Sequence, residues 1–270
     1  SFSGQCGDSL YWELVDTTLH ITGKGEMYDY KSDSAPWKLL VSSIKVLTIA
    51  EDVTKLSQSF DSCSVLESIV WNARHAADAY SEGQYVYPIF YDIRSQIKSF
   101  TFGENVEYIP TYLCTGMDKL TSMTIPNSVT SIGKSAFEGC SAIDSIVWNA
   151  KNCADASSLE TAPFYAIRSQ ITSFTFGENV EHIPAYLCAG MDKLTSMIIP
   201  NSVTSIGKYA FYDCSSLTSV TINSDAIVSK AYSFDSNISH IFGSQVTEYI
   251  IGESVISIGS DAFNGCSALT

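Results

Sequence analysis

One stretch of this chain is repeated along its length. The residues Leu120 to Cys140 return almost unchanged as Leu194 to Cys214, and a looser copy runs from Val246 to Cys266. Such self-similarity indicates that the folding unit is a short coil that stacks on its neighbours, rather than a core assembled from distant segments. The repetition therefore predicts a repeat architecture. It says less about function, because stacked coils are used mainly as surfaces.

The repeat aligns on a Leu-x-x-Leu-x-Leu pattern with a basic period of 23 residues. The first apolar residue of the pattern in each coil lies 22, 31, 23, 23, 28, 23, 23, 29 and 23 residues from that of the coil before it. Long and short coils therefore alternate in modules of long, short, short, over 66–142, 143–216 and 217–270, with the last module cut short. The first positions are Ile44, Leu66, Ile97, Leu120, Ile143, Ile171, Leu194, Leu217, Val246 and Leu269.

Each coil is predicted to contain a short strand, a turn and a return side. Leu120, Met123 and Ile125 have the spacing of a strand of about five to six residues. The sequence Pro126-Asn127-Ser128 predicts a turn, because proline fixes its own φ and cannot donate to a sheet. A bulky apolar residue then recurs once per coil on the return side, at Phe60, Leu113, Phe137, Leu187, Phe211 and Phe263.

These residues resemble the BspA-type leucine-rich repeats of bacterial and protozoan surface proteins. The resemblance covers about 44–270 and rests on LTSMTIPNSVTSIGKSAFEGCSAI, LTSMIIPNSVTSIGKYAFYDCSSL and VTEYIIGESVISIGSDAFNGCSAL. The amino-terminal stretch, with SGQCGDSLYWELVD, TLHITGKGEMYDY and APWKLL, also looks like the entry cap of that family. We expect a hairpin around Asp16-Thr17-Thr18 that covers the exposed end of the first coil. Its predicted inward residues are Trp12, Leu14, Leu19 and Ile21.

The chain departs from the ribonuclease-inhibitor type of repeat, because Ser128 or Ser202 replaces its Asn ladder and the return side is too short for a full helix. The expected fold is an α/β-type repeat fold, a right-handed leucine-rich-repeat solenoid with one parallel β-sheet. It is β-rich, with short helical or turn return segments and an N-terminal β-hairpin cap. The expected domains are the cap at 1–43 and a solenoid of about nine coils at 44–270.

The net charge of −14 limits the classes of partner. It argues against nucleic acid, whose phosphates would be repelled, and against an anionic membrane surface. No apolar run approaches the ~18 residues that a membrane span needs, so no membrane insertion is expected in this segment. The chain starts at Ser1 without a signal peptide and stops two residues into a new strand. We therefore expect a processed or trimmed start and a natural protein that continues.

The cysteines follow the repeat rather than a disulfide framework. Cys63, Cys140, Cys214 and Cys266 occupy one repeat position, where Met117 and Met191 stand in other coils. A position that accepts Cys or Met is a small apolar slot, and cysteines about 14 Å apart are beyond the ~7 Å Cα limit of a disulfide. Cys114 and Cys188 form a second matched pair. We expect most of these to be buried thiols outside any disulfide.

The sequence supports no catalytic or metal-binding pattern. The histidines, His20, His75, His182 and His240, are not paired at metal-ligand spacing, and no Cys-x-x-Cys occurs. Gly133-Lys134-Ser135 resembles the end of a phosphate loop, but serine stands where the first glycine is required. His182 replaces Tyr108 of the preceding module, which indicates a structural residue. We expect no enzyme activity, no cofactor and no metal.

The long coils carry the candidate binding residues. Their insertions, Asn72–Gln96, Asn149–Gln170 and Asn223–Gln245, end alike, so Phe90, Phe164 and Phe242 are predicted core rings. Insertions in solenoids often lie on one face and bind partners, although loops also pack on their own coils. Tyrosine is favoured at interfaces because it offers contact area and a hydroxyl at low entropic cost. The candidate ligand-binding residues are Tyr80, Tyr85, Tyr87, Tyr165 and Tyr232.

The resemblance implies a secreted or surface-attached module for adhesion or protein binding, without an activity. We therefore expect a non-catalytic extracellular or cell-surface recognition module that binds a host or partner protein. One alternative is a structural spacer or stalk that presents another domain, and another is a glycan-binding module. The ladder of serine and threonine on the outward strand face is the second candidate surface. A spacer should tolerate replacement of the tyrosine-rich insertions, whereas a binder should not.

Overall fold

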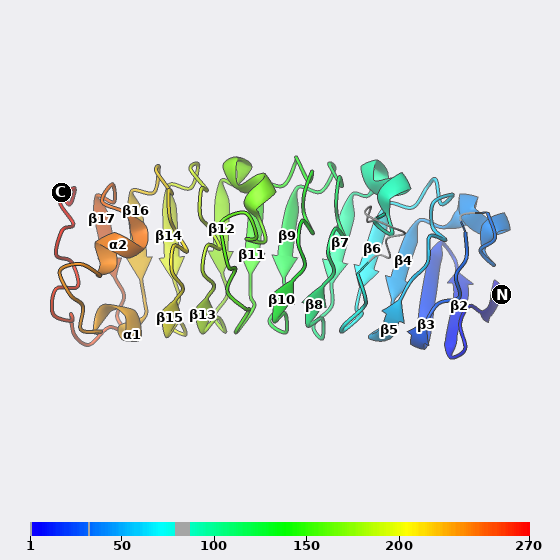
Figure 1. The fold of residues 1–270 in the computed structure, drawn as a ribbon, viewed down its shortest axis with the longest axis horizontal. Helices are drawn as coiled ribbons and strands as arrows, with labels where there is room; N and C mark the ends of the chain where they lie inside the picture. The colour runs from blue at the N-terminus through cyan, green and yellow to red at the C-terminus, as the bar shows by residue number, and fades with distance from the viewer. Residues whose placement is uncertain (1, 32, 79–86) are drawn as a thin grey trace. The chain divides into compact units, whose positions relative to one another are not determined.

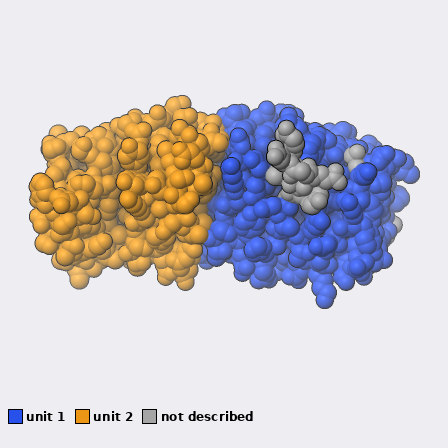
Figure 2. All heavy atoms as spheres, viewed as in Figure 1, with its two compact units in different colours: residues 1–143 blue, residues 144–270 orange. Residues whose placement is uncertain are grey.

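The computed structural model describes residues 2–31, 33–78 and 87–270 (Figure 1). The chain forms two compact units, Ser1–Ile143 and Asp144–Thr270, which are coloured separately in Figure 2. Each unit is built from the same kind of coil. The predicted division into a cap at 1–43 and a solenoid at 44–270 stays a prediction.

The first unit opens with the predicted hairpin. Strand β2 (Leu10–Val15) pairs antiparallel with β3 (Thr18–Glu26), and Asp16 adopts a φ of 53° in the turn between them. Alternate residues of the two strands face the core, and Trp12, Leu14, Leu19 and Ile21 are all buried, as predicted. The sequence did not predict β1 (Phe2–Gln5), which adds an antiparallel strand to the outer edge of β2.

The hairpin leads directly into the parallel strands of the coils. Strand β3 pairs in parallel with β4 (Val46–Ile49), β4 with β6 (Ser68–Trp71), and β6 with β7 (Ser99–Phe102). Strand β9 (Ser122–Ile125) belongs to the next coil. Strands β4, β6, β7 and β9 each begin two residues after the predicted first position of their coil, and the second and fourth residues of each are buried. The repeat register read from the sequence is therefore confirmed.

The first unit also contains short strands on the return side, and 3-10 helices that end where a coil begins. Strand β5 (Asp52–Lys55) pairs in parallel with β3, and β8 (Tyr108–Ile109) pairs in parallel with β10 (Ser131–Ile132). The 3-10 helices are η1 (Lys38–Ser43) and η2 (Tyr91–Gln96). Short return segments were predicted, but the second set of parallel strand pairs was not.

The second unit repeats this plan. Strand β11 (Ser145–Trp148) pairs in parallel with β12 (Ser173–Phe176), and β14 (Ser196–Ile199), β16 (Ser219–Ile222) and β17 (Glu248–Ile251) form a parallel sheet. On the return side β13 (His182–Ile183) pairs in parallel with β15 (Ser205–Ile206). The helices are η3 (Tyr165–Gln170), α1 (Asp225–Val228) and α2 (Ile238–Phe242). Throughout the described residues, no helix is both long and apolar enough to cross a bilayer.

Aromatic rings fill the interior of both units. Phe60, Phe137 and Phe211 are buried at the predicted ring position, and Leu113 and Leu187 are buried where they replace it. The predicted core rings of the insertions, Phe90, Phe164 and Phe242, are also buried. Each such ring stabilises the fold by roughly 1.5–3 kcal/mol in transfer terms. Phe263, in the last coil, is half-buried.

The cysteines act as small apolar core residues. All eight lie among the described residues, seven are buried, and no disulfide forms there. The Cys140 thiol donates to the Cys114 carbonyl at 3.1 Å, and the Cys214 thiol donates to the Cys188 carbonyl at 3.2 Å. Burial raises the pKa of Cys140 and of Cys214 to about 12, so both remain thiols at physiological pH.

Candidate functional site

The five candidate tyrosines differ in what the structure shows of them. Tyr80 and Tyr85 lie outside the described residues. Of the other three, Tyr87 is exposed, with 43% of its surface accessible, whereas Tyr165 and Tyr232 are half-buried. Tyr87 belongs to the first unit, and Tyr165 and Tyr232 belong to the second.

Tyr87 is held at its side chain and at its main chain. Its hydroxyl donates to Asp92 Oδ1 at 2.5 Å, and this hydrogen bond is the main reason that the pKa of Tyr87 rises to about 12. Its ring lies 5.2 Å from the ring of Tyr91. The side-chain amide of Gln58 donates to the Tyr87 carbonyl at 3.0 Å. The exposed ring is therefore fixed before any partner arrives.

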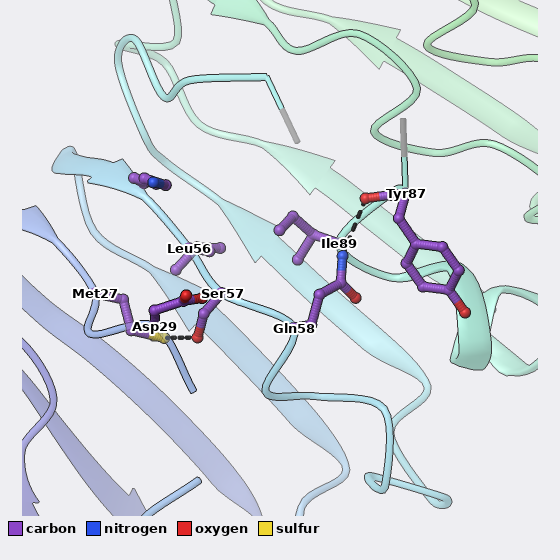
Figure 3. A pocket seen from close by; sticks show the side chains of 8 residues that line it. Met27, Asp29, Leu56, Ser57, Gln58, Tyr87 and Ile89 are labelled. Carbon is purple, nitrogen blue, oxygen red and sulfur yellow. Dashed lines mark hydrogen bonds between the residues drawn. The ribbon is translucent and has the colours of Figure 1, made fainter. Parts of the chain in front are cut away.

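A cavity of about 480 Å³ lies beside Tyr87 in the first unit. Figure 3 shows Gln58 reaching across to the main chain of Tyr87, while the Tyr87 ring points away from Met27 at the opposite side. Ser57 donates to the thioether sulfur of Met27 at 3.3 Å. The walls combine apolar and charged groups, which suits a side chain or a small molecule with both kinds of surface. The lining residues are Met27, Asp29, Lys55, Leu56, Ser57, Gln58, Tyr87 and Ile89.

The carboxyl group of Asp61 lies next to Asp92, which accepts the hydrogen bond of the Tyr87 hydroxyl. Burial, together with the charge of Asp92, raises the pKa of Asp61 to about 7, and protonated Asp61 hydrogen-bonds Asp92. Its Oδ1 is buried and accepts no hydrogen bond from any described residue. Asp92 therefore lies between a tyrosine hydroxyl and a carboxyl group, and both limit where the Tyr87 side chain can point.

Tyr165 is covered on one face by its own insertion. The Arg168 guanidinium lies 4.1 Å from the ring centroid, and its Nη1 donates to the Tyr165 carbonyl at 2.8 Å. The first unit repeats this arrangement with Arg94 over Tyr91, at 3.9 Å. Tyr165 is therefore the counterpart of Tyr91, and part of its ring already takes part in an internal cation–π contact.

The hydroxyl of Tyr232 is also used within its own insertion. It donates to the Ile227 carbonyl at 2.6 Å, and burial raises its pKa to about 12. The Tyr232 main-chain N–H donates to the Ser260 carbonyl at 2.9 Å. These contacts tie the third insertion to the last coil.

A repeated aspartate attaches each insertion to a later turn, and the sequence prediction did not include it. Asp78, Asp155 and Asp225 accept the main-chain N–H groups of Thr111, Ala185 and Ile256 at 2.8, 2.8 and 2.9 Å. The signal was available, because each aspartate follows the asparagine that opens its insertion by a few residues.

The same aspartates explain His182. His182 Nε2 lies 2.7 Å from Asp155 Oδ1, and the Tyr108 hydroxyl donates to Asp78 Oδ1 at 2.6 Å. Burial raises the pKa of Asp155, but the hydrogen bonds from His182 and Ala185 outweigh it and the pKa is lowered overall. His182 is a structural residue equivalent to Tyr108, as the sequence indicated.

The described residues contain no group of three His, Cys, Asp or Glu side chains that could hold a metal ion. Glu51, one of the glutamates that follow a strand, forms an ion pair with Arg74 at 3.4 Å and accepts from Asn105 at 2.6 Å. Both of its oxygens therefore have contacts within the protein.

A further group of exposed aromatic residues was not predicted. Tyr186, Tyr209 and Tyr212 of the second unit form a chain of ring contacts on the return side, and Tyr209 and Tyr212 are exposed. The signal was a direct comparison of the two nearly identical copies, which differ at the positions of Tyr209 and Tyr212.

The family model described as BspA type leucine-rich repeat region (6 copies) matches residues 86–158 and 157–270. The chain therefore belongs to the BspA-type leucine-rich repeat family, and its fold is the strand-rich leucine-rich-repeat fold. This is a family of repeat modules that are generally non-catalytic and serve protein interaction or surface roles. No curated protein matches the chain.

Three solved bacterial structures are similar to the chain at low identity. A leucine-rich repeat protein from Eubacterium ventriosum ATCC 27560 is 17% identical over 99% of this chain and 89% of that chain, with a TM-score of 0.37. A leucine-rich cell surface protein from Faecalibacterium prausnitzii A2-165 is 15% identical over 100% and 98%, with a TM-score of 0.31. A leucine-rich repeat protein from Bacteroides ovatus ATCC 8483 is 19% identical over 97% and 80%, with a TM-score of 0.37. At these scores the likeness adds nothing to the family match.

Proposed function

We propose that this chain is a non-catalytic recognition module, secreted or displayed at the cell surface, that adheres to a partner protein. Membership of the BspA-type family supports the surface role. The observation that supports binding most directly is Tyr87, an exposed ring fixed at the rim of a cavity of about 480 Å³. The partner is a protein outside the cell, and a host protein fits this description.

Tyr87 has the properties of an interface anchor. Tyrosine buries a large area on binding and loses little conformational freedom, since it has two side-chain torsions. Here the hydrogen bonds to Asp92 and from Gln58 have already ordered the residue. Less entropy is then lost on association, so more of the contact energy contributes to affinity. The adjacent cavity can receive a side chain of the partner beside the ring.

The proposed contact set is Tyr80, Tyr85, Tyr87, Tyr165 and Tyr232, with Tyr87 as its leading member. Of the three that the structure describes, Tyr87 is the one with an exposed ring. The net charge of −14 also favours a basic partner, because opposite charge raises the rate of encounter.

The test compares Tyr87→Ser with Tyr11→Ser. Tyr11 is a matched control because it is also exposed, at 50%, but lies on the cap strand β2. A partner is first identified by crosslinking on intact cells, and its affinity for each purified variant is then measured by biolayer interferometry. We expect Tyr87→Ser to weaken binding by roughly tenfold or more, in the range of interface hot spots, and Tyr11→Ser to leave it unchanged.

Two outcomes would contradict the proposal. Replacement of all five tyrosines with serine, without any loss of affinity, would favour the spacer role or the hydroxyl face of the strands. Binding to a glycan array, without binding to any protein, would favour the glycan-binding alternative. Circular dichroism on each variant shows whether the fold survives, which we expect because Phe90, Phe164 and Phe242 are retained.

A further inference from the structure

Two return segments with nearly the same sequence differ only on their outer surface. Pro126–Cys140 of the first unit and Pro200–Cys214 of the second unit are identical except at three positions. The second unit carries Tyr209, Tyr212 and Asp213 where the first carries Ser135, Glu138 and Gly139. The inward residues are the same in both segments and are buried in both. The core therefore does not require the three differences.

Part of this surface is built on left-handed backbone, which the first unit shares at Tyr112 and Ser135. Tyr209 and Asp213 have φ angles of 60° and 58°, and Tyr186 has a φ of 62°. Residues other than glycine are disfavoured in this left-handed region by about 1 kcal/mol each. Packing does not compensate fully, because 44% of Tyr209 and 57% of Tyr212 remain exposed. Tyr209 therefore combines a left-handed backbone with a large exposed ring, which points to a role at the surface.

The rings of Tyr186, Tyr209 and Tyr212 form what we call the tyrosine ridge. Tyr186 follows β13, and Tyr209 and Tyr212 follow β15. The centroids of Tyr186 and Tyr209 are 5.3 Å apart with the planes at 41°, and those of Tyr209 and Tyr212 are 5.6 Å apart at 74°. Lys208 Nζ lies 4.7 Å from the Tyr209 centroid. One face of Tyr209 is thus already in contact with a cation of the same unit.

The ridge ends at a cavity of about 320 Å³ in the second unit. Tyr212 and Asp213 line one side, and His240, Gly243 and Gln245 belong to the helix α2 and the residues after it on the other. An exposed ring next to a carboxylate and a cavity matches an arginine side chain, which can stack on the ring and pair with the carboxylate.

The ring geometry and the charge decide between classes of partner. The planes of neighbouring rings are inclined at 41° and 74°, so the three rings do not form one flat platform for the faces of successive sugar rings. The chain carries 29 acidic and 15 Lys or Arg residues, which favours a basic partner. We propose that the tyrosine ridge and its cavity are a docking site for a basic, arginine-containing segment of a protein partner. This inference rests on the proposed function, because it assumes that the chain binds proteins.

The chain itself supplies matched variants for a test. Tyr209→Ser, Tyr212→Glu and Asp213→Gly together convert the ridge to the surface of the first unit. The reverse set, Ser135→Tyr, Glu138→Tyr and Gly139→Asp, builds a second ridge beside Tyr112. Each set removes one acidic side chain and adds another, so the net charge stays at −14 in both variants. General electrostatic attraction is therefore the same in all three proteins.

The probe is a fluorescein-labelled arginine–glycine repeat peptide. Its binding is measured by fluorescence anisotropy at physiological ionic strength. A glutamate–glycine peptide is the charge control. We expect the full chain to bind the arginine peptide, the loss variant to bind it roughly tenfold more weakly, and the graft variant, which keeps the original ridge and cavity, to bind it at least as tightly as the full chain. Failure of the full chain to bind the arginine peptide, or equal binding by the loss variant, would overturn the proposal.

The same variants separate this inference from the proposed function. If the loss variant keeps its affinity for a crosslinked partner while Tyr87→Ser loses it, the function stands and the ridge is not the docking site. If the full chain binds no protein, the proposed function fails as well. If a glycan array shows binding that the loss variant loses, the ridge binds sugar and the proposal of a basic protein segment is wrong.

Discussion

The coil Leu120–Cys140 in the first unit and the coil Leu194–Cys214 in the second show which positions fix the fold and which are left to function. They differ at four positions, and all four lie outside the core. Besides the three positions on the return side, Thr124 on the strand becomes Ile198, which is exposed. Each inward residue is identical. The exposed surface of a coil can therefore change while its core stays the same, because inward side chains pack in the core and outward side chains do not.

The largest expected effect tests whether the two cores are equivalent. Phe137→Ala and Phe211→Ala should each lower the free energy of unfolding by about 3–5 kcal/mol, because each removes a buried ring and leaves a cavity. Urea denaturation followed by circular dichroism measures the change. We expect the two losses to agree within about 1 kcal/mol. A large difference would mean that the identical sequences pack differently in the two units.

The next effect concerns the close approach of neighbouring coils. A Cβ added at Gly133 would lie 2.3 Å from the main-chain nitrogen of Thr111, and one added at Gly207 would lie 2.2 Å from that of Ala185. Main chain cannot move aside easily, so Gly133→Ala and Gly207→Ala should each cost about 1–3 kcal/mol. Gly25→Ala is a useful contrast, because no atom lies within 4 Å of the added Cβ and only its φ of 91° opposes the change. Unfolding midpoints in urea provide the measurement, and unchanged midpoints for Gly133→Ala and Gly207→Ala would show that the coils are not so closely packed.

The third effect is a dependence of the free energy of unfolding on pH, which arises from Asp61 in the first unit. Asp61 follows Phe60 at the position that Glu138 and Tyr212 occupy after Phe137 and Phe211. Burial first, and the charge of Asp92 second, raise the pKa of Asp61 to about 7. Between about pH 4 and pH 7 the unfolded chain has released this proton while the folded chain retains it, so the free energy of unfolding falls as pH rises. Below this range both states are protonated and the effect vanishes.

Asp61→Asn removes this pH dependence. At pH 8 the variant should be more stable than the parent by about 1–2 kcal/mol, a value that allows for solvent screening of the half-exposed side chain. Near pH 4 the two should be equal. Asp92→Asn should give a smaller change of the same sign, because the charge of Asp92 is the lesser cause. Stability measured by urea denaturation from pH 4 to pH 8 tests this, and parallel curves for parent and Asp61→Asn would show that Asp61 does not titrate in this range.

The fold could be predicted well from the sequence because the same spacing of apolar residues recurs in many coils. A single coil leaves the inward role of Met123 uncertain, but the matching Met197 and the regular apolar spacing define the strand register. The same repetition identified Phe90, Phe164 and Phe242 as core rings. The short strands at 108–109 and 131–132 were missed because two residues carry no period of their own and form through pairing with the neighbouring coil.

The candidate site was harder to predict because the sequence does not show which tyrosine side chains pack against their own insertion and which remain exposed. Tyr87 and Tyr232 look alike in the sequence, and both hydroxyls donate within the protein, to Asp92 and to the Ile227 carbonyl, but Tyr87 is exposed while Tyr232 is half-buried. The ridge was missed for a different reason. A comparison of the two copies shows that Tyr209 and Tyr212 replace Ser135 and Glu138, but it does not show the positive φ at Tyr209, because this residue is neither glycine nor asparagine.

The smallest expected effect concerns this strain, and it bears most directly on why the two coils differ. Ser135 and Tyr209 share the left-handed backbone, with φ angles of 55° and 60°. Ser135→Gly should therefore raise the free energy of unfolding by about 0.5 kcal/mol, since relief of strain exceeds the added freedom of the unfolded chain. Tyr209→Gly relieves the same strain but also removes the ring contact with Tyr186 at 5.3 Å. Aromatic pairs contribute about 0.5–1.5 kcal/mol, so this variant should be no more stable than the parent. Urea denaturation of both variants, with Tyr209→Ser as the matched control, measures the difference. If Tyr209→Gly is stabilised as much as Ser135→Gly, then the ring contributes nothing to the folded chain, and only binding accounts for its presence at a strained position.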